Sequence, residues 1–286
     1  MNGVSEGAGV YLEASRRIDD AAAVILGIPY DGGTSYRAGA SAAPRDVREA
    51  SQSIETYSPT LRRDLEDVAY ADAGDLDLAG LDAKAVMERV ADVVEEHLRA
   101  GRFIAAIGGD HSISIGTTMG SRRVHDELAH VVFDAHLDMR PEYDGSEYSH
   151  ACGTRHMSLA GPTVALGIRS GARTEFADAD EMLVAWSADL ELPPAARDSI
   201  GERPVHVSLD LDVLDPSILS GTGTPEPGGA TYKELRAALL ALSELNVVAI
   251  DLCEMSPNFD PSGVSAVVAA ELIREAILGL GPGRSL

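Results

Sequence analysis

Cysteine is scarce in this 286-residue chain, which contains only Cys152 and Cys253. Two cysteines cannot build a disulfide framework, and neither lies in a Cys-x-x-Cys pair or in a spacing typical of a zinc knuckle. The sequence also lacks a run of 18 apolar residues, and its N-terminus lacks a charged segment followed by an apolar one. We therefore expect a soluble protein of the reducing cytoplasm, not exported and with no membrane partner.

Lysine is almost absent: Lys84 and Lys233 are the only lysines among 23 basic residues. The chain contains 46 acidic residues. The formal net charge of −23 would repel a phosphate backbone, so nucleic acid is not expected as a partner. Concentrated salt screens such self-repulsion, and a halophilic source is one hypothesis. The alternative is a GC-rich genome, in which arginine codons replace lysine codons.

Salt dependence of folding distinguishes these two sources. The Debye length grows from ~3 Å at 1 M salt to ~10 Å at 0.1 M, so withdrawing salt restores repulsion between surface carboxylates. A halophilic protein is expected to lose melting temperature as NaCl is lowered, which thermal melts followed by circular dichroism will measure. A melting temperature indifferent to NaCl would contradict the halophilic hypothesis.

Six short apolar runs indicate buried strands, because they are apolar on both faces rather than alternating. They cover residues 21–30, 103–108, 130–136, 163–170, 204–212 and 246–252. Strands of this kind occur in parallel sheets whose two faces are both covered by helices.

Helical patterns lie between several of these runs. The clearest covers residues 81–101, where valine and leucine recur every three or four positions. A second helix is expected over 231–245, opened by a capping box of Thr231 and Glu234, and a third over 263–279.

The alternation of strand and helix without a linker predicts one α/β domain over residues 1–286, with three αβα layers around a mainly parallel central sheet. Two glycine- and proline-containing stretches, 138–162 and 214–230, each follow a strand directly. Because functional sites of such folds lie at the carboxyl ends of the strands, we interpret both stretches as site loops and not as linkers.

Potential metal ligands follow three of the expected strands. They are Asp134, His136 and Asp138 at the end of the third run, Asp210 and Asp212 at the end of the fifth, and Asp110 and His111 after the second. Strand side chains alternate, so the three residues at alternate positions in DAHLD are expected to point to the same side. A single aspartate after a strand is usually a turn or helix cap, but three such clusters at one sheet edge favour a shared site.

Clustered carboxylates repel one another unless a cation lies between them. The donors include imidazoles and no thiolate, which suits Mn²⁺ or Mg²⁺, and the two histidines favour Mn²⁺. Four aspartates and two histidines exceed what one ion needs when water is also bound. They would suit two ions ~3.5–4 Å apart, an arrangement that activates water for hydrolysis.

The chain resembles the ureohydrolases, a family that includes arginase and agmatinase and hydrolyses guanidino compounds to urea. The resemblance extends over nearly the whole chain and rests on GIPYDGGTSYRAGASAAPRDVREAS, GGDHS, DAHLD, SLDLDVLDPS with GTGTPEPGG, and DLCEMSP. The loop sequence SHAC resembles that of archaeal agmatinases. The resemblance implies an arginase-like fold and a homo-oligomer, either a trimer or a hexamer.

The same resemblance implies two Mn²⁺ ions per chain. One would be held by His111, Asp134, Asp138 and Asp210, and the other by Asp134, His136, Asp210 and Asp212. Asp134 and Asp210 would then bridge both ions, and Asp110 would support the ring or the loop of His111.

Two further residues match positions of the family that act on the substrate. Glu254 matches the carboxylate that pairs with the guanidinium, and His150 matches the histidine of proton transfer, a role for which His156 is the competitor. The mechanism implied is attack of activated water on the guanidinium carbon and collapse to urea and an amine.

The substrate is expected to be agmatine, cleaved to urea and putrescine for polyamine synthesis. The loop MRPEYDGSEYSH is rich in acidic and aromatic residues and would repel a substrate carboxylate. Arg140 argues the other way, since it would bind a carboxylate unless it pairs with Glu142 or Asp144. Arginase and guanidinobutyrase activities therefore remain alternatives, and a non-catalytic metal-binding homologue is the alternative outside enzymes.

Overall fold

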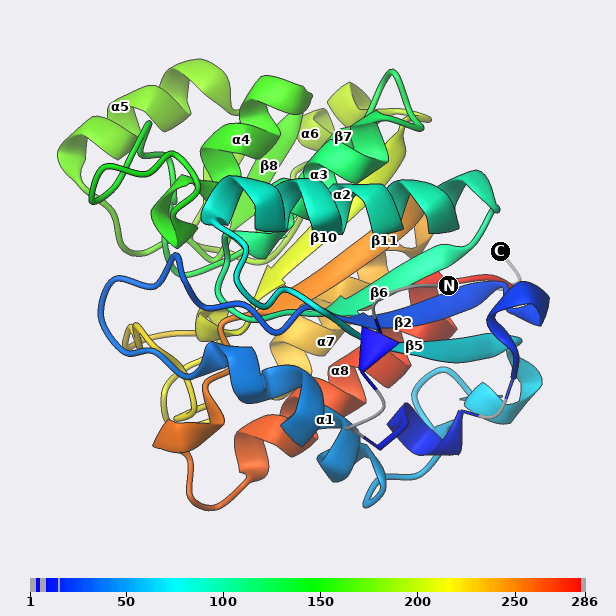
Figure 1. Cartoon of the computed structure of the whole chain (residues 1–286). Coiled ribbons are helices and arrows are strands. Elements are labelled where there is room, and N and C mark those ends of the chain that lie inside the picture. Colours follow the sequence, from blue (N-terminus) through cyan, green and yellow to red (C-terminus); the bar gives the residue numbers. More distant parts are fainter. Residues whose placement is uncertain (1–3, 6–8, 15, 284–286) are drawn as a thin grey trace.

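The computed structural model describes residues 4–5, 9–14 and 16–283. A large central sheet lies in the middle of the molecule, and the short strands β3 Tyr57–Ser58 and β4 Arg63–Asp64 form a separate pair (Figure 1). Within the described residues the central sheet has nine strands, in the order β1-β5-β2-β6-β11-β10-β7-β8-β9. They are β1 Val4–Ser5, β2 Ala23–Gly27, β5 Tyr70–Leu76, β6 Phe103–Ile107, β7 Ala129–Phe133, β8 Thr163–Leu166, β9 Ala185–Ser187, β10 Pro204–Asp210 and β11 Asn246–Cys253. Every neighbouring pair is parallel except β1 with β5 at one edge, which confirms the mainly parallel sheet.

Helices cover both faces of this sheet and complete the expected three layers (Figure 1). They are α1 Ala43–Ser51, α2 Ala83–Arg99, α3 Ile113–Arg122, α4 Gly153–Ala160, α5 Arg173–Met182, α6 Pro194–Ile200, α7 Tyr232–Leu240 and α8 Val264–Leu280. Helices α2, α3 and α4 pack on one face, and α1, α7 and α8 pack on the other. The strands between them are therefore apolar on both sides, as in other sheets of this kind.

The helix termini follow the capping signals of the sequence. Asp82 is the N-cap of α2, where its carboxylate accepts a hydrogen bond of 2.8 Å from the backbone N–H of Ala85. At the start of α7, Thr231 and Glu234 form the expected capping box. The helix predicted over 231–245 is shorter than expected: α7 ends at Leu240, and residues Ala241–Glu244 form a 3-10 helix.

Strand β5 is the main element that the apolar runs did not predict. Its sequence, YADAGDL, places Asp72 and Asp75 beside Arg48 of α1, whose side chain is fully buried. The Nε and Nη2 atoms of Arg48 donate to the two oxygens of Asp72 at 2.8 and 2.9 Å, and Nη1 donates to Asp75. Buried charges are tolerated only when paired and hydrogen-bonded, so a distant arginine accounts for the acidic residues in this strand.

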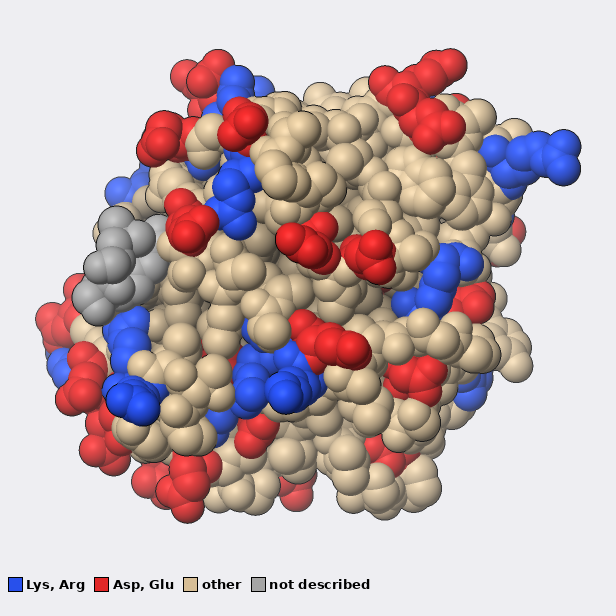
Figure 2. All heavy atoms as spheres, turned by 180° about the vertical axis from the view of Figure 1, so that it is seen from behind, with Lys and Arg blue, Asp and Glu red and all other residues tan. Residues whose placement is uncertain are grey.

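Charged side chains of both signs lie close together on one face of the molecule (Figure 2). On the face drawn in Figure 2, Lys and Arg side chains are interspersed with Asp and Glu side chains. Among the residues that the structure describes, no helix has both the length and the apolar character needed to cross a bilayer.

Candidate metal centre

The potential ligands gather at the carboxyl ends of four neighbouring strands, β6, β11, β10 and β7. Asp110 and His111 follow β6, the DAHLD segment follows β7, Asp210 ends β10, and Glu254 follows β11. Parallel strands end at the same edge of a sheet, so segments far apart in sequence meet there. The three clusters expected to converge are thus brought together.

The first group of donors surrounds Nδ1 of His111. This nitrogen lies 3.0 Å from Oδ2 of Asp134, 2.9 Å from Oδ2 of Asp138 and 3.4 Å from Oδ2 of Asp210. All four side chains are buried or nearly so.

The second group surrounds Nδ1 of His136. This nitrogen lies 2.9 Å from Oδ2 of Asp212 and 3.7 Å from Oδ1 of Asp134. Asp134 therefore directs one carboxylate oxygen to each histidine, and the two groups share it.

The convergence of DAHLD does not come from strand alternation. The strand expected over 130–136 ends at Phe133, and the ligand positions lie in the segment that follows it. Asp138 adopts a left-handed backbone conformation with φ 49°, which is uncommon for a residue other than glycine. The three side chains do lie together, as expected, but the alternation of side chains along a strand is not the reason.

The electrostatics of the cluster fit bound cations. Burial and the carboxylates of Asp212 and Asp134 raise the pKa of Asp210 well above its usual value. Oδ2 of Asp134 is buried, and its contact of 3.0 Å with Nδ1 of His111 lacks the geometry of a hydrogen bond. A buried carboxylate oxygen without a well-directed hydrogen bond, in a group of like charges, is costly, and a hard or borderline divalent cation would remove both penalties.

The carboxylates of this cluster also act on His136. Its burial opposes the charged imidazolium, but the carboxylates of Asp212 and Asp134 outweigh burial and raise the pKa of His136 to about 12. The proton on this ring therefore partly compensates a group of negative charges.

Ser208 and Asp251 lie behind His111 and orient its ring. Ser208 Oγ donates to Oδ1 of Asp251 at 2.7 Å and lies 2.9 Å from Nε2 of His111. Because the serine proton is directed to Asp251, the serine oxygen can accept from Nε2–H, which leaves the Nδ1 lone pair facing the carboxylates. Neither residue was predicted from the sequence, although a carboxylate inside the apolar run 246–252 was a usable signal.

Glu254 and His150 form a pair beside the first group. Nδ1 of His150 lies 3.1 Å from Oε1 of Glu254, and the same oxygen accepts a hydrogen bond of 2.9 Å from the backbone N–H of His111. Burial lowers the pKa of His150, but Glu254 outweighs it and raises the value to about 9. The pair thus offers a carboxylate and a proton donor at one point.

Asp110 is turned away from the donor groups. Its carboxylate accepts hydrogen bonds from the backbone N–H groups of Gly33 at 2.7 Å and Ser112 at 2.9 Å. Burial and the nearby Glu254 raise the pKa of Asp110 to about 6. Its contacts therefore join the 31–35 loop to the segment of His111 and do not reach the imidazole ring.

A cavity of about 360 Å³ opens over the donors. Its lining includes His150 and, farther out, Arg140, Tyr143 and Glu175. Nε of Arg140 lies 3.4 Å from Oε2 of Glu175, and its guanidinium lies over the ring of Tyr143, 5.0 Å from the centroid. The partner of Arg140 is therefore Glu175 of α5 and not Glu142 or Asp144, the two partners expected from the sequence.

His156 is not among the residues that line this cavity. Its Nε2 lies 2.9 Å from the backbone oxygen of Glu147, and its ring stacks on Tyr148 with a centroid separation of 6.0 Å. Of the two histidines considered for proton transfer, His150 is the one placed beside Glu254.

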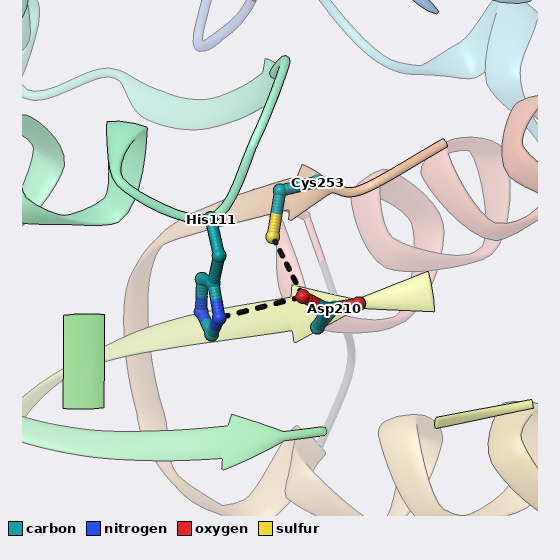
Figure 3. A group of neighbouring side chains, drawn as sticks. All are labelled: His111, Asp210 and Cys253. Atoms are coloured by element: carbon teal, nitrogen blue, oxygen red, sulfur yellow. Dashed lines mark hydrogen bonds and ion pairs between the residues drawn. The ribbon is translucent and has the colours of Figure 1, made fainter. Parts of the chain in front are cut away.

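Cys253 approaches the first group from the core side. Figure 3 shows its sulfur and the ring of His111 directed to the same carboxylate of Asp210. The thiol donates to the backbone oxygen of Leu209 at 3.6 Å and to Oδ2 of Asp210 at 3.9 Å. Burial and the adjacent carboxylates raise the pKa of Cys253 well above its usual value, so the thiol acts here as a hydrogen-bond donor.

Comparisons with known proteins agree with this geometry. The Arginase family matches residues 21–279. An agmatinase from Bacillus anthracis is 38% identical over 277 residues, which cover 94% of this chain and 96% of that protein. An agmatinase from Pyrococcus horikoshii is 36% identical over 272 residues, covering 92% and 93%. The solved structure of an agmatine ureohydrolase of Thermoplasma volcanium has a TM-score of 0.85 at 31% identity, with 96% of this chain and 94% of that chain covered.

The fold and the site define an α/β enzyme that carries clustered carboxylate and imidazole donors at the carboxyl edge of a parallel sheet. The family match extends over most of the chain, and the relatives match nearly all of it. The chain belongs to the arginase family and is a ureohydrolase, which confirms the resemblance drawn from the sequence.

Proposed function

We propose that the protein hydrolyses agmatine to urea and putrescine with two Mn²⁺ ions. The observation that carries the proposal is the sharing of Asp134 between two donor groups, with Glu254 and His150 beside them. His111, Asp134, Asp138 and Asp210 would hold one ion, and Asp134, His136, Asp210 and Asp212 the other. Such a pair of ions, when bound, activates water at neutral pH and offsets the repulsion between the carboxylates.

Glu254 would bind the planar guanidinium of the substrate, because a carboxylate accepts two of its parallel N–H groups. The backbone N–H of His111 holds one oxygen of this carboxylate at 2.9 Å, so the group is oriented before substrate arrives. The guanidinium carbon would then lie beside the donor groups.

His150 would deliver a proton to the departing nitrogen. The amine must leave protonated, and the raised pKa of about 9 keeps the imidazolium form available at neutral pH. Water supplies the oxygen of urea, so the reaction needs no covalent intermediate with the protein.

Agmatine is favoured over guanidino acids by the activity of several relatives and by the acidic loop 138–150. Two relatives that match more than nine tenths of the chain are agmatinases. In this chain Arg140 is already engaged by Glu175, so its charge is partly neutralised before any substrate enters.

Urea release tests the proposal. The Mn²⁺-loaded protein is expected to release urea from agmatine at least about 100-fold faster than from arginine or 4-guanidinobutanoate, because a charge mismatch at a specificity site costs several kcal/mol. A side-by-side assay of the three compounds at equal concentration provides the measurement. Preference for arginine or for 4-guanidinobutanoate would replace agmatine in the proposal, and no release from any guanidino compound would refute hydrolysis.

A further inference from the structure

The imidazole ring of His136 has a carboxylate on each side. Nδ1 lies 2.9 Å from Oδ2 of Asp212, and Nε2 lies 3.6 Å from Oε1 of Glu226, in the GTGTPEPGG loop after β10. In the neutral ring that binds a cation, a proton held on Nε2 leaves the Nδ1 lone pair directed to the second donor group. We infer that Glu226 is a positioning residue, which fixes the orientation and tautomer of His136 and so strengthens the second cation position. This inference rests on the proposed function only in taking Nδ1 of His136 as a ligand atom.

The side chain of Glu226 is itself held in place. Ser170 Oγ donates a hydrogen bond of 2.8 Å to Oε1 of Glu226, the same oxygen that faces His136. Ser170 and His136 are partners in a parallel β-bridge, so the two side chains start from adjacent backbone positions. One oxygen of Glu226 is thereby fixed between a hydroxyl and the imidazole.

The backbone of Glu226 is held as well. Nη2 of Arg169 donates to the carbonyl oxygens of Glu226 at 2.9 Å and Asp212 at 2.7 Å. Two residues before Glu226 in the same loop, Thr224 Oγ1 donates to Oδ2 of Asp212 at 3.2 Å. The loop therefore contacts both Asp212 and His136 of the second donor group. A glutamate that only faced solvent would not need these contacts.

The arrangement parallels the one behind His111, where Ser208 faces the outer nitrogen. A carboxylate at this position does more than a hydroxyl, because it also raises the basicity of the imidazole toward a cation. The side chain of Glu226 is 35% exposed, so water screens part of this effect and a complete loss of binding is not expected on its removal.

Titration of the metal-free, full-length protein with Mn²⁺ alone in a calorimeter tests the inference. Glu226→Ala is expected to weaken one class of Mn²⁺ site by about 10- to 100-fold and to leave the other unchanged. Glu226→Gln should recover most of the lost affinity, because its amide oxygen can accept from Nε2–H. Ser170→Ala should shift the same class in the same direction by a smaller factor, and exposed Glu191→Ala serves as the control.

The melting temperature of the metal-free variants completes the test. Positioning predicts that Glu226→Ala melts like the wild type without Mn²⁺ and differs only when the ion is added. Equal Mn²⁺ affinities for wild type and Glu226→Ala would overturn the inference. Weaker Mn²⁺ binding at both sites, together with a lower melting temperature of the metal-free variant, would also overturn it, because that result indicates that Glu226 only stabilises the loop. If the wild type bound no Mn²⁺, the proposed function itself would be refuted, and this result would be distinct from a failure of the role of Glu226.

Discussion

Replacing Glu254 by glutamine is expected to lower kcat/KM for agmatine by on the order of 10²- to 10³-fold while Mn²⁺ binding is retained. Removing the charge of one partner of a buried pair costs about 2–5 kcal/mol, which corresponds to about 30- to 5,000-fold in rate and includes the expected loss. The glutamine oxygen can still accept the hydrogen bond that His111 N–H gives to Oε1, so the local backbone should persist. Steady-state urea release and a calorimetric Mn²⁺ titration of the same preparation measure both quantities.

The matched control for this variant is Glu202→Gln, an equivalent change at an exposed residue before β10, at the opposite end of the strand from the donors. It should match the wild type in both measurements. Unchanged kinetics of Glu254→Gln would remove Glu254 from the guanidinium site. Loss of Mn²⁺ along with activity would instead make Glu254 part of the metal centre.

Asp134→Asn is expected to abolish turnover and to lose both ions, because Asp134 is the carboxylate that faces both His111 and His136. A ligand that binds only the folded state stabilises it by about 2.7 kcal/mol at a concentration 100 times its Kd. The wild-type melting temperature should therefore rise when Mn²⁺ is added, and that of Asp134→Asn should not. Differential scanning fluorimetry with and without Mn²⁺, and metal analysis after desalting, provide the measurements.

Asp198→Asn on the exposed surface of α6 is the control for the loss of one negative charge. It should keep the Mn²⁺-dependent rise in melting temperature. Two ions per chain retained by Asp134→Asn would contradict a shared carboxylate, whereas retention of one would show that only one of the two positions depends on Asp134.

The elements that could be predicted from sequence are those whose own residues determine them. Helix α2 has its apolar spacing and its cap at Asp82 within one continuous segment, and the six apolar runs need no distant partner to be recognised as strands. Strand β5 escaped prediction because Asp72 is stabilised in the core by Arg48, 24 positions earlier in the chain. Long-range pairing of this kind leaves no local periodicity.

The same distinction applies to the site. The types of the ligand residues and their positions at strand ends could be predicted from the sequence. Their convergence could be predicted too, because parallel strands place their carboxyl ends at one edge of the sheet. The left-handed backbone at Asp138 and the contact of Arg140 with Glu175 depend on how loops pack, and the sequence pattern did not contain them. The roles of Ser208 and Glu226 were missed for the same reason, since each acts through a histidine from a distant segment of the chain.

The sheet order has a consequence for synthesis of the chain on the ribosome. Strand β11, the last to be made, lies between β6 and β10, and those two strands pair with it and not with each other. A nascent chain that stops before Asn246 therefore contains two groups of strands with no shared hydrogen-bond ladder between them. Glu254 and the carboxylate of Asp251 emerge with this final strand, so the centre of the sheet and the site above it are completed in the same step.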